Sequence, residues 1–549
     1  MKYSVLSVVW LFFALTLSAQ NPTCYRIYLS DKANSPYSID NPSAYLSQRA
    51  IDKRARFNIP ITEQDLPVNP QYKQQILALD AEMQLLSVSK WMNTVTIYCP
   101  DSTVVPQIEA LPFVDSVWAV GNYILNEPPV FQNPENPVPL THNTFSSSKD
   151  TNDYGEGLAQ IALLNGIPLH EAGFRGEGML IAVIDGGFFG IETTTFYQQL
   201  VNDNRFLGHY SLMPDFVDTL QSGWEEVHGT IVTSAIAANT NGEFVGTAPA
   251  ASYALIHTEW VGSEELVEED FWANGAEIAD SLGADVINSS LGYRTFPDFP
   301  QNDITYVDMD GVNSIASRCA TILGQKGVIV CVAAGNDGNN EFYHISRPGD
   351  AFDILCVGAC TSDSIIADFS SRGPSYDGRV KPDITSQGVS TACYYPYDML
   401  STANGTSLAT PVAAGMCACL WQAMPQYTST EMMQFIRESS HLYDNPDTGF
   451  GYGIPNFYQV YTSHVGINDY NPLQLSVYPN PATDKLYLTN TDGNIQSISI
   501  FNATGQLVLQ HPVNGNPLIE INVTSLPKGF YVGTATLGGN KKASFKFVK

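Results

Sequence analysis

Positive charge is scarce in this chain. Its 549 residues include 26 Lys and Arg against 55 Asp and Glu, a formal net charge of −29. A surface with so few cations repels phosphate backbones, which excludes nucleic acid as a partner. The shortage is uneven, because from Pro472 onward six Lys outnumber three acidic residues, a net of +3 that leaves −32 on residues 1–471. The C-terminal segment therefore has a different kind of surface from the rest.

Long apolar runs are also missing, except at the start. Val5–Leu17 is apolar, follows Lys2 and precedes Ala19, which is typical of a secretory signal peptide ending at residue 19. The run is too short to span a bilayer comfortably, and no comparable run follows it. We therefore expect a soluble mature protein that has left the cytoplasm.

The cysteines are few and odd in number. With nine of them, at least one cannot pair within the chain, and the sequence assigns no disulfide. Those at 331, 356, 417 and 419 lie in apolar segments, which predicts small buried hydrophobic side chains. Cys356 and Cys360 are spaced like half of a metal site, but no second His or Cys pair lies nearby. Zinc is therefore not predicted.

Residues 20–125 have the pattern of a small α+β domain. CYRIYL, TVTIYC and SVWAV are typical of strands, and NPQYKQQILALD and TVVPQIEALP are typical of helices. The next segment, 126–150, is rich in Pro, Asn and Ser and has no apolar period. It is predicted to be a linker that proteases can reach.

Residues 151–465 change to long apolar strands. Five runs are almost continuously apolar: MLIAVID, SYALIHT, ADVINSS, GVIVCVAA and FDILCVGA. Such runs are typical of strands buried on both faces, and helical stretches such as VHGTIVTSAIAAN lie between them. This predicts an α/β domain with a doubly wound parallel sheet. After a short linker, 466–473, residues 474–549 alternate with period two, which predicts an antiparallel β-sandwich.

Three residues with matching chemistry lie at element ends. Asp185 closes the run MLIAVID, His228 opens a small-residue helix, and Ser407 lies in NGTSLATP just ahead of a long apolar run. A serine there could simply be a helix N-cap. It becomes a nucleophile when an imidazole takes its proton and a carboxylate holds that imidazole. Chemistry in parallel sheets lies at the carboxyl ends of strands, and the chain order Asp–His–Ser is a known arrangement of this triad.

Two further strand ends complete the candidate site. GVIVCVAAGN ends on Asn336, whose amide could donate to an oxyanion together with the backbone N–H of Ser407. The segment Ser290-Leu291-Gly292 could pair with an extended peptide as an added strand. With Ala334 and Gly335 it is predicted to bind the substrate.

These motifs resemble those of the subtilisin-like serine proteases. The matching blocks are DGG at 185–187, HGT at 228–230, NSSLG at 288–292, AAGN at 333–336 and GTSLATP at 405–411. The resemblance covers roughly residues 155–465 and implies a serine endopeptidase. In that family Ser407 would be the nucleophile, His228 the general base, Asp185 the orienting carboxylate and Asn336 an oxyanion donor. The chain departs at Gly186, where the family usually has Ser or Thr that can hydrogen-bond the carboxylate.

The flanking segments fit the same family. A small α+β domain ahead of such a protease implies a propeptide that inhibits it intramolecularly until cleavage within 126–150. An ordinary N-terminal binding domain is the alternative. The end of the chain resembles a type IX secretion sorting domain through SVYPNPATDKLYL and four late lysines, at positions 541, 542, 546 and 549. A carbohydrate-binding sandwich is the alternative there.

The whole sequence thus predicts a secreted or cell-surface zymogen that crosses the periplasm and the outer membrane. Its partners would be protein or peptide substrates, its own propeptide and the type IX machinery, and it would act as a monomer. No cofactor is needed for the chemistry and no metal ligand is assigned, although a structural calcium ion is common in the family. Two other functions stay open at this point: a catalytically decayed surface-binding protein, and a serine esterase with the same triad.

Overall fold

The computed structural model describes most of the chain. The described residues are 23–122, 154–213, 227–260, 264–297, 299–464, 475–490, 495–502, 504–513, 518–537 and 542–549. The chain divides between Tyr461 and Thr462 into two compact units, and each unit is described by itself. The predicted signal peptide and both predicted linkers lie outside the described residues.

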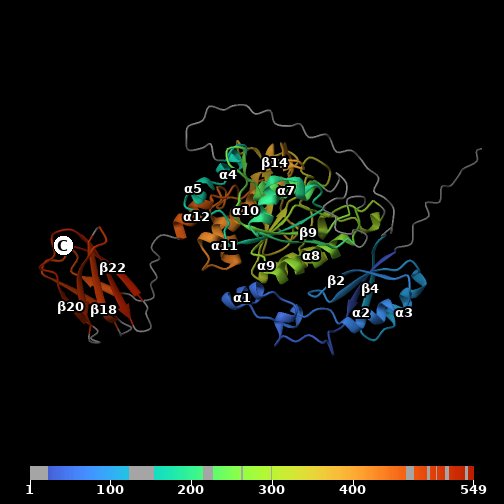
Figure 1. The fold of residues 1–549 in the computed structure, drawn as a ribbon, viewed down its shortest axis with the longest axis horizontal. Coiled ribbons are helices and arrows are strands. Elements are labelled where there is room, and N and C mark those ends of the chain that lie inside the picture. Colours follow the sequence, from blue (N-terminus) through green and yellow to red (C-terminus); the bar gives the residue numbers. More distant parts are fainter. Residues whose placement is uncertain are drawn as a thin grey trace, which may run out of the picture. The chain divides into compact units, whose positions relative to one another are not determined.

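The N-terminal domain is an antiparallel sheet with α2 (Pro70–Leu77) and α3 (Val105–Glu109) on one face, while α1 (Gln48–Arg56) lies apart from the sheet (Figure 1). The sheet order is β2-β3-β1-β4, built from β1 (Cys24–Leu29), β2 (Gln84–Ser89), β3 (Thr94–Tyr98) and β4 (Val114–Gly121). Ile27 and Ile97 pack with Ile76 of α2 and Ile108 of α3. Because side chains alternate along a strand, Arg26 lies on the opposite face.

A seven-stranded parallel sheet organises the next domain. Its order is β13-β12-β11-β10-β5-β9-β6. The strands are β5 (Leu180–Asp185), β6 (Phe206–Ser211), β9 (Ser252–His257), β10 (Val286–Ser289), β11 (Ile329–Ala333), β12 (Leu355–Cys360) and β13 (Ile384–Gln387). All six residues of β5 are buried, as expected for a strand covered on both faces. The fold is therefore the doubly wound α/β architecture that the apolar runs predict.

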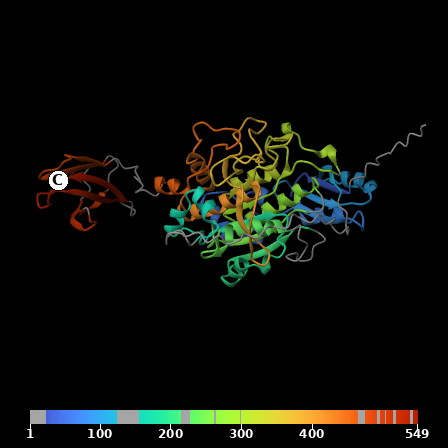
Figure 2. The ribbon, with the colours of Figure 1, turned by 90° about the horizontal axis from the view of Figure 1, so that it is seen from above.

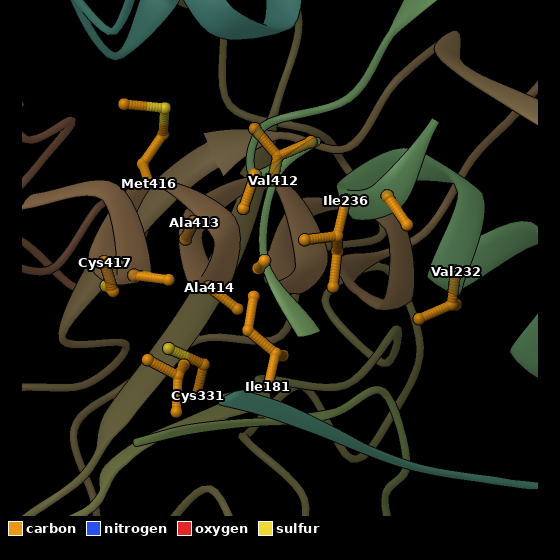
Figure 3. Packing of buried hydrophobic residues seen from close by; sticks show 14 of the residues in the cluster. Ile181, Val232, Ile236, Cys331, Val412, Ala413, Ala414, Met416 and Cys417 are labelled. Atoms are coloured by element: carbon orange, nitrogen blue, oxygen red, sulfur yellow. The ribbon is translucent and has the colours of Figure 1, made fainter. Parts of the chain in front are cut away.

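Helices cover both faces of this sheet. Ile181 and Val183 of β5 point into one core, with α7 (His228–Ala237) and α10 (Thr406–Ala423). Figure 3 shows part of that core, with Ile181 beside Cys331, Ala414 and Ile236. Ala182 and Ile184 point the other way, toward α8 (Glu268–Leu282) and α9 (Ile315–Gln325). The two cores hold the strand ends in fixed positions.

Shorter elements complete this unit. They are α4 (Leu158–Leu163), α5 (Ile167–Glu171), α6 (Thr195–Asn202), α11 (Ser429–Glu438), α12 (Phe457–His464), and the hairpins β7 (Asn239–Thr240) with β8 (Phe244–Val245) and β14 (Thr391–Tyr395) with β15 (Met399–Ala403). The N-terminal domain, in blue, lies against the parallel-sheet domain in both ribbon views (Figures 1 and 2). None of the described helices is long and apolar enough to cross a membrane.

The C-terminal unit is a β-sandwich. One sheet is β16 (Leu475–Tyr478), β17 (Lys485–Asn490) and β20 (Leu518–Asn522); the other is β19 (Leu507–Pro512), β18 (Ile495–Asn502), β21 (Phe530–Leu537) and β22 (Lys542–Val548). Every pairing in it is antiparallel. Leu486 and Ile521 of the first sheet pack with Ile498 and Phe547 of the second, which gives the sandwich one core.

Candidate active site

The first half of the site joins Asp185 to His228. Asp185 ends β5 with no exposed surface, and His228 begins α7. The His228 Nδ1–Asp185 Oδ1 distance is 2.6 Å. A side chain on Gly229 would come within 2.4 Å of the Gly187 carbonyl oxygen, so glycine is what lets α7 approach the loop after Asp185. The sequence therefore brings an imidazole onto a buried carboxylate.

The two carboxylate oxygens of Asp185 differ in their hydrogen bonds. Oδ1 also accepts a hydrogen bond from the backbone N–H of Gly186 at 2.8 Å. Oδ2 is buried and has no hydrogen-bond partner among the described residues. The missing side chain at Gly186 thus leaves one carboxylate oxygen without a donor. Burial disfavours the charged form of His228, but the charge and hydrogen bond of Asp185 outweigh it and hold the pKa of His228 above its usual value of 6.5.

Ser407 lies in the first turn of α10. The helix follows Gly405, whose φ of 145° is a conformation that favours glycine. Pro411 has no N–H to donate to the Ser407 carbonyl, as an ordinary residue four places on would. The Ser290 hydroxyl donates to that carbonyl instead, at 2.8 Å, and the Ser407 hydroxyl donates to the Ser290 carbonyl at 3.1 Å. The motif NGTSLATP thus ties the start of α10 to the predicted substrate segment.

The amide of Asn336 has a defined orientation. Its Oδ1 accepts hydrogen bonds from the backbone N–H of Thr406 at 2.9 Å and from the Thr406 hydroxyl at 3.1 Å. Because the oxygen is occupied, the Nδ2 group is left to donate to a ligand. Thr406 was not among the predicted site residues, although it lies inside the GTS motif.

A cavity of about 230 Å³ lies beside Ser407. Its lining comprises Glu264, Ser290, Leu291, Gly292, Arg294, Thr295, Ala333, Gly335, Asn336, Asp337, Ser346, Thr406 and Ser407. Four of the five predicted substrate residues are in this lining. The fifth, Ala334, is fully buried, and its carbonyl accepts a hydrogen bond from the backbone of Ser346 at 3.0 Å. Glu264 and Arg294 escaped the sequence analysis, because only the tertiary fold brings them to the cavity.

The two halves of the site lie on packed elements, since α7 and α10 contact one another. The Ser407 hydroxyl, however, donates to Ser290 and not to His228. Catalytic hydrogen bonds are often unmade in ligand-free enzymes. The arrangement can supply a base, a nucleophile and an oxyanion donor.

Comparisons with known proteins agree with this geometry. Residues 176–453 match the model of the Subtilase family, which is half of the chain. The chain belongs to the subtilase family. Subtilisin E of Bacillus subtilis (strain 168) is 30% identical over 291 residues, which cover 52% of this chain and 67% of that protein. M-protease of Shouchella clausii (strain KSM-K16) is 31% identical over 288 residues, which cover 52% of this chain and 65% of that protein. Serine protease AprX of Bacillus subtilis (strain 168) is 25% identical over 308 residues, which cover 51% of this chain and 65% of that protein.

The flanking domains of this subtilase also match known families. Residues 24–133 match the Peptidase S8 propeptide domain of Bacteroidota, and residues 476–549 match the Secretion system C-terminal sorting domain. The predicted propeptide and sorting domain are therefore confirmed, and the alternatives of an N-terminal binding domain and a carbohydrate-binding sandwich are wrong. The protein is a serine-type endopeptidase, a hydrolase.

The propeptide contacts the subtilase domain first through its sheet. Arg26 donates to both carboxylate oxygens of Asp270 on α8, at 2.7 and 2.5 Å, and both side chains are buried. Glu277 of the same helix accepts hydrogen bonds from the Ser89 hydroxyl and from the backbone N–H groups of Lys90 and Trp91, at 2.6 to 2.9 Å. The strands of the propeptide are thus fixed on α8.

A second contact is made by residues 47–66, which we call the clasp. Arg54 is buried and donates to both oxygens of Asp280 at 2.8 and 2.9 Å, and to Asp65 at 3.3 Å. Lys326, at the end of α9, donates to Asp65 at 2.9 Å. Burial lowers the pKa of Lys53 to about 8, and its ammonium donates to the Ala284 carbonyl at 2.6 Å. The clasp therefore binds to the C-terminal ends of α8 and α9.

The described residues contain no group of three or more His, Cys, Asp or Glu side chains that could hold a metal ion. A structural calcium ion stays a prediction without a position. All nine cysteines are buried, as predicted for the four in apolar segments. Burial raises the pKa of Cys356 to about 12, which suits a packing role and not a reactive one.

Proposed function

We propose that this subtilase is a secreted endopeptidase that hydrolyses peptide bonds through Ser407, His228 and Asp185. The observation that carries the proposal is the 2.6 Å contact between His228 and the buried Asp185. Asp185 lies at the carboxyl end of a parallel strand, where active sites of such folds are found. The carboxylate leaves Nε2 of His228 as the proton acceptor, because it engages Nδ1.

The reaction would begin with a rotation of the Ser407 hydroxyl from the Ser290 carbonyl toward His228. His228 takes the hydroxyl proton while Oγ attacks the substrate carbonyl carbon. The Nδ2 group of Asn336 and the backbone N–H of Ser407 donate to the oxyanion that forms. His228 then gives its proton to the leaving amine, and an acyl-enzyme on Ser407 remains. A water molecule, activated by the same imidazole, releases the acid and restores the hydroxyl.

An extended peptide is the substrate that the cavity fits best. Leu291 is half-buried and Gly292 is exposed, so the backbone of this segment is open to pairing with a substrate strand. The cavity of about 230 Å³ would take one substrate side chain beside Ser407. An esterase needs only the acyl group of its substrate and would make no use of this edge.

The flanking domains would set where and when the enzyme acts. The propeptide would inhibit the subtilase domain until a cut in residues 126–150 separates them. The sorting domain would direct export by the type IX machinery to the cell surface or beyond it. The mature enzyme would act as a monomer on protein or peptide substrates.

Hydrolysis assays test this function. The chain without residues 1–19 and its Ser407→Ala variant are both treated with trypsin to remove the propeptide and are then compared on a fluorogenic casein and on a small ester. We expect the parent to cleave the casein and the variant to lose that activity by about 10⁶-fold, a scale found for this residue in subtilisin, a relative. Cleavage of the ester with no cleavage of casein would favour the esterase instead.

A further inference from the structure

A buried glutamate links the triad to the substrate segment. Glu259 lies two residues after β9, with 8% of its surface exposed. Its Oε1 accepts hydrogen bonds from the Tyr293 hydroxyl at 2.5 Å and from the Thr258 hydroxyl at 3.0 Å. The backbone N–H of Thr258 in turn donates to the carbonyl of Asp185 at 3.1 Å. One chain of contacts therefore runs from the orienting aspartate to Tyr293.

Tyr293 connects two segments that line the Ser407 cavity. It follows Gly292 directly, and only 1% of its surface is exposed. Its backbone N–H donates to the Arg347 carbonyl at 2.9 Å, and the N–H of Arg347 donates back at 3.4 Å. Arg347 follows Ser346, which also lines the cavity and whose hydroxyl oxygen lies close to Gly292. The position of Tyr293 therefore affects both the substrate segment and Ser346.

The surroundings of Glu259 favour a neutral carboxylic acid. Burial, with the nearby carboxyl of Glu264 adding to it, raises the pKa of Glu259 well above its usual value; the hydrogen bonds from Tyr293 and Thr258 act against this, and Asp185 acts with it. Glu268 is another buried carboxyl with a pKa raised by burial and by Glu259. No Lys or Arg in the described part of the chain forms an ion pair with Glu259. A protonated Glu259 still accepts the hydrogen bonds from the Tyr293 and Thr258 hydroxyls, and it places no second negative charge near Asp185.

We propose that Glu259 is a positioning residue that, through its hydrogen bond to Tyr293, holds the segment 290–292 in the conformation that pairs with an extended substrate. This inference rests on the proposed function of that segment. Removing the Glu259 acceptor leaves the buried Tyr293 hydroxyl without a hydrogen-bond partner. Because an unpaired buried hydroxyl is costly, the Tyr293 side chain moves to find another partner. A displaced Tyr293 carries Gly292 with it, so binding of extended peptides weakens while the triad stays in place.

The test separates binding from chemistry. Glu259→Leu removes the acceptor, Glu259→Gln keeps a neutral carbonyl oxygen there, and Tyr293→Phe removes the donor. Each matured enzyme is assayed on a tetrapeptide nitroanilide, with fluorophosphonate labelling of Ser407 as a check on the site. We expect KM to rise about tenfold in Glu259→Leu and Tyr293→Phe with kcat changed less than twofold. Glu259→Gln should keep the parent KM, and the Leu/Phe double variant should be no worse than either single one.

Two results would overturn the inference. One is a parent-like KM in both Glu259→Leu and Tyr293→Phe. The other is an equal loss of kcat in Glu259→Gln and Glu259→Leu, which would mean that the carboxylate charge acts on the triad. Because Tyr293→Phe removes a single oxygen, it keeps the test valid if Glu259→Leu does not fold. A parent enzyme that neither labels nor cleaves the peptide would contradict the proposed function itself, a different outcome from either of these.

Discussion

The clasp should keep the propeptide bound to the subtilase domain after the chain between them is cut. Asp280→Asn keeps the shape of the side chain but removes the charge that Arg54 contacts with two hydrogen bonds at 2.8 and 2.9 Å. Both side chains are at most 1% exposed, so solvent does not screen the pair. Breaking a buried ion pair costs about 3–5 kcal/mol. The lower end applies because Arg54 retains Asp65, at 3.3 Å.

A cost of about 3 kcal/mol corresponds to a propeptide that binds about 10²-fold more weakly. The parent should therefore keep its cleaved propeptide through gel filtration, with low activity on casein. The Asp280→Asn enzyme should lose the propeptide on the column and show full activity sooner. The substitution lies on α8, away from Ser407, so the activity of the two propeptide-free enzymes should agree.

Asp363→Asn is the matched control, because it removes the same charge from an exposed position. It should behave as the parent does. If the cleaved propeptide co-elutes with the Asp280→Asn enzyme as strongly as with the parent, the ion pair does not hold the clasp and the reasoning fails.

Three further predictions concern the active site. Asn336→Leu should lower kcat by about 10²–10³-fold, the range found for such an amide in subtilisin, with little change in KM. A kcat near that of the parent would show that Asn336 is not an oxyanion donor. Because His228 must be neutral to accept a proton and Asp185 holds its pKa above 6.5, kcat/KM should fall as the pH drops, with its midpoint above pH 6.5; a pH–rate profile with a midpoint below 6.5 would refute this. Gly186→Ser offers a donor to the unpartnered Oδ2 of Asp185, which stabilises the carboxylate and weakens its hold on the imidazolium. The same profile should then shift to lower pH, and an upward shift would show the sign to be wrong.

The interior of the parallel sheet could be predicted from the sequence, but its edges could not. The five predicted strands became β5, β9, β10, β11 and β12, because strands buried on both faces must be almost continuously apolar. The edge strands β6 and β13 have the sequences FLGHYS and ITSQ, and the apolar pattern gave no sign of either. An edge strand needs less apolar surface, and its pairing depends on a neighbour that is distant in sequence.

The chemistry of the site was predictable where a motif carries it. Asp185, His228, Asn336 and Ser407 each lie at an element end that an apolar run marks. Thr406 is inside a recognised motif, but its hydrogen bonds to Asn336 depend on how α10 meets β11. Glu259 and Tyr293 have no sequence signal, since their pairing joins segments 34 residues apart.

The clasp shows what charge patterns leave undetermined. QRAIDKRAR, the sequence of α1, has the composition of a solvated surface helix. Its Arg54 is nevertheless buried against an aspartate 226 residues away. A cation on a helix face indicates only that an anion or water must meet it, and the fold decides which. The domain boundaries stay predictions. The ranges that match the three family models begin and end within a few to about 25 residues of the predicted boundaries.

Above all, we propose that Ser407 is the nucleophile of a protease that matures itself. The direct measurement is an intact-mass time course of the chain without residues 1–19, with a fluorophosphonate probe present, beside Ser407→Ala. We expect the parent to lose a fragment that ends within residues 126–150 and to gain one probe on Ser407, while the variant does neither. A variant that gains the probe, or a parent that stays unlabelled after trypsin has removed its propeptide, would contradict this proposal.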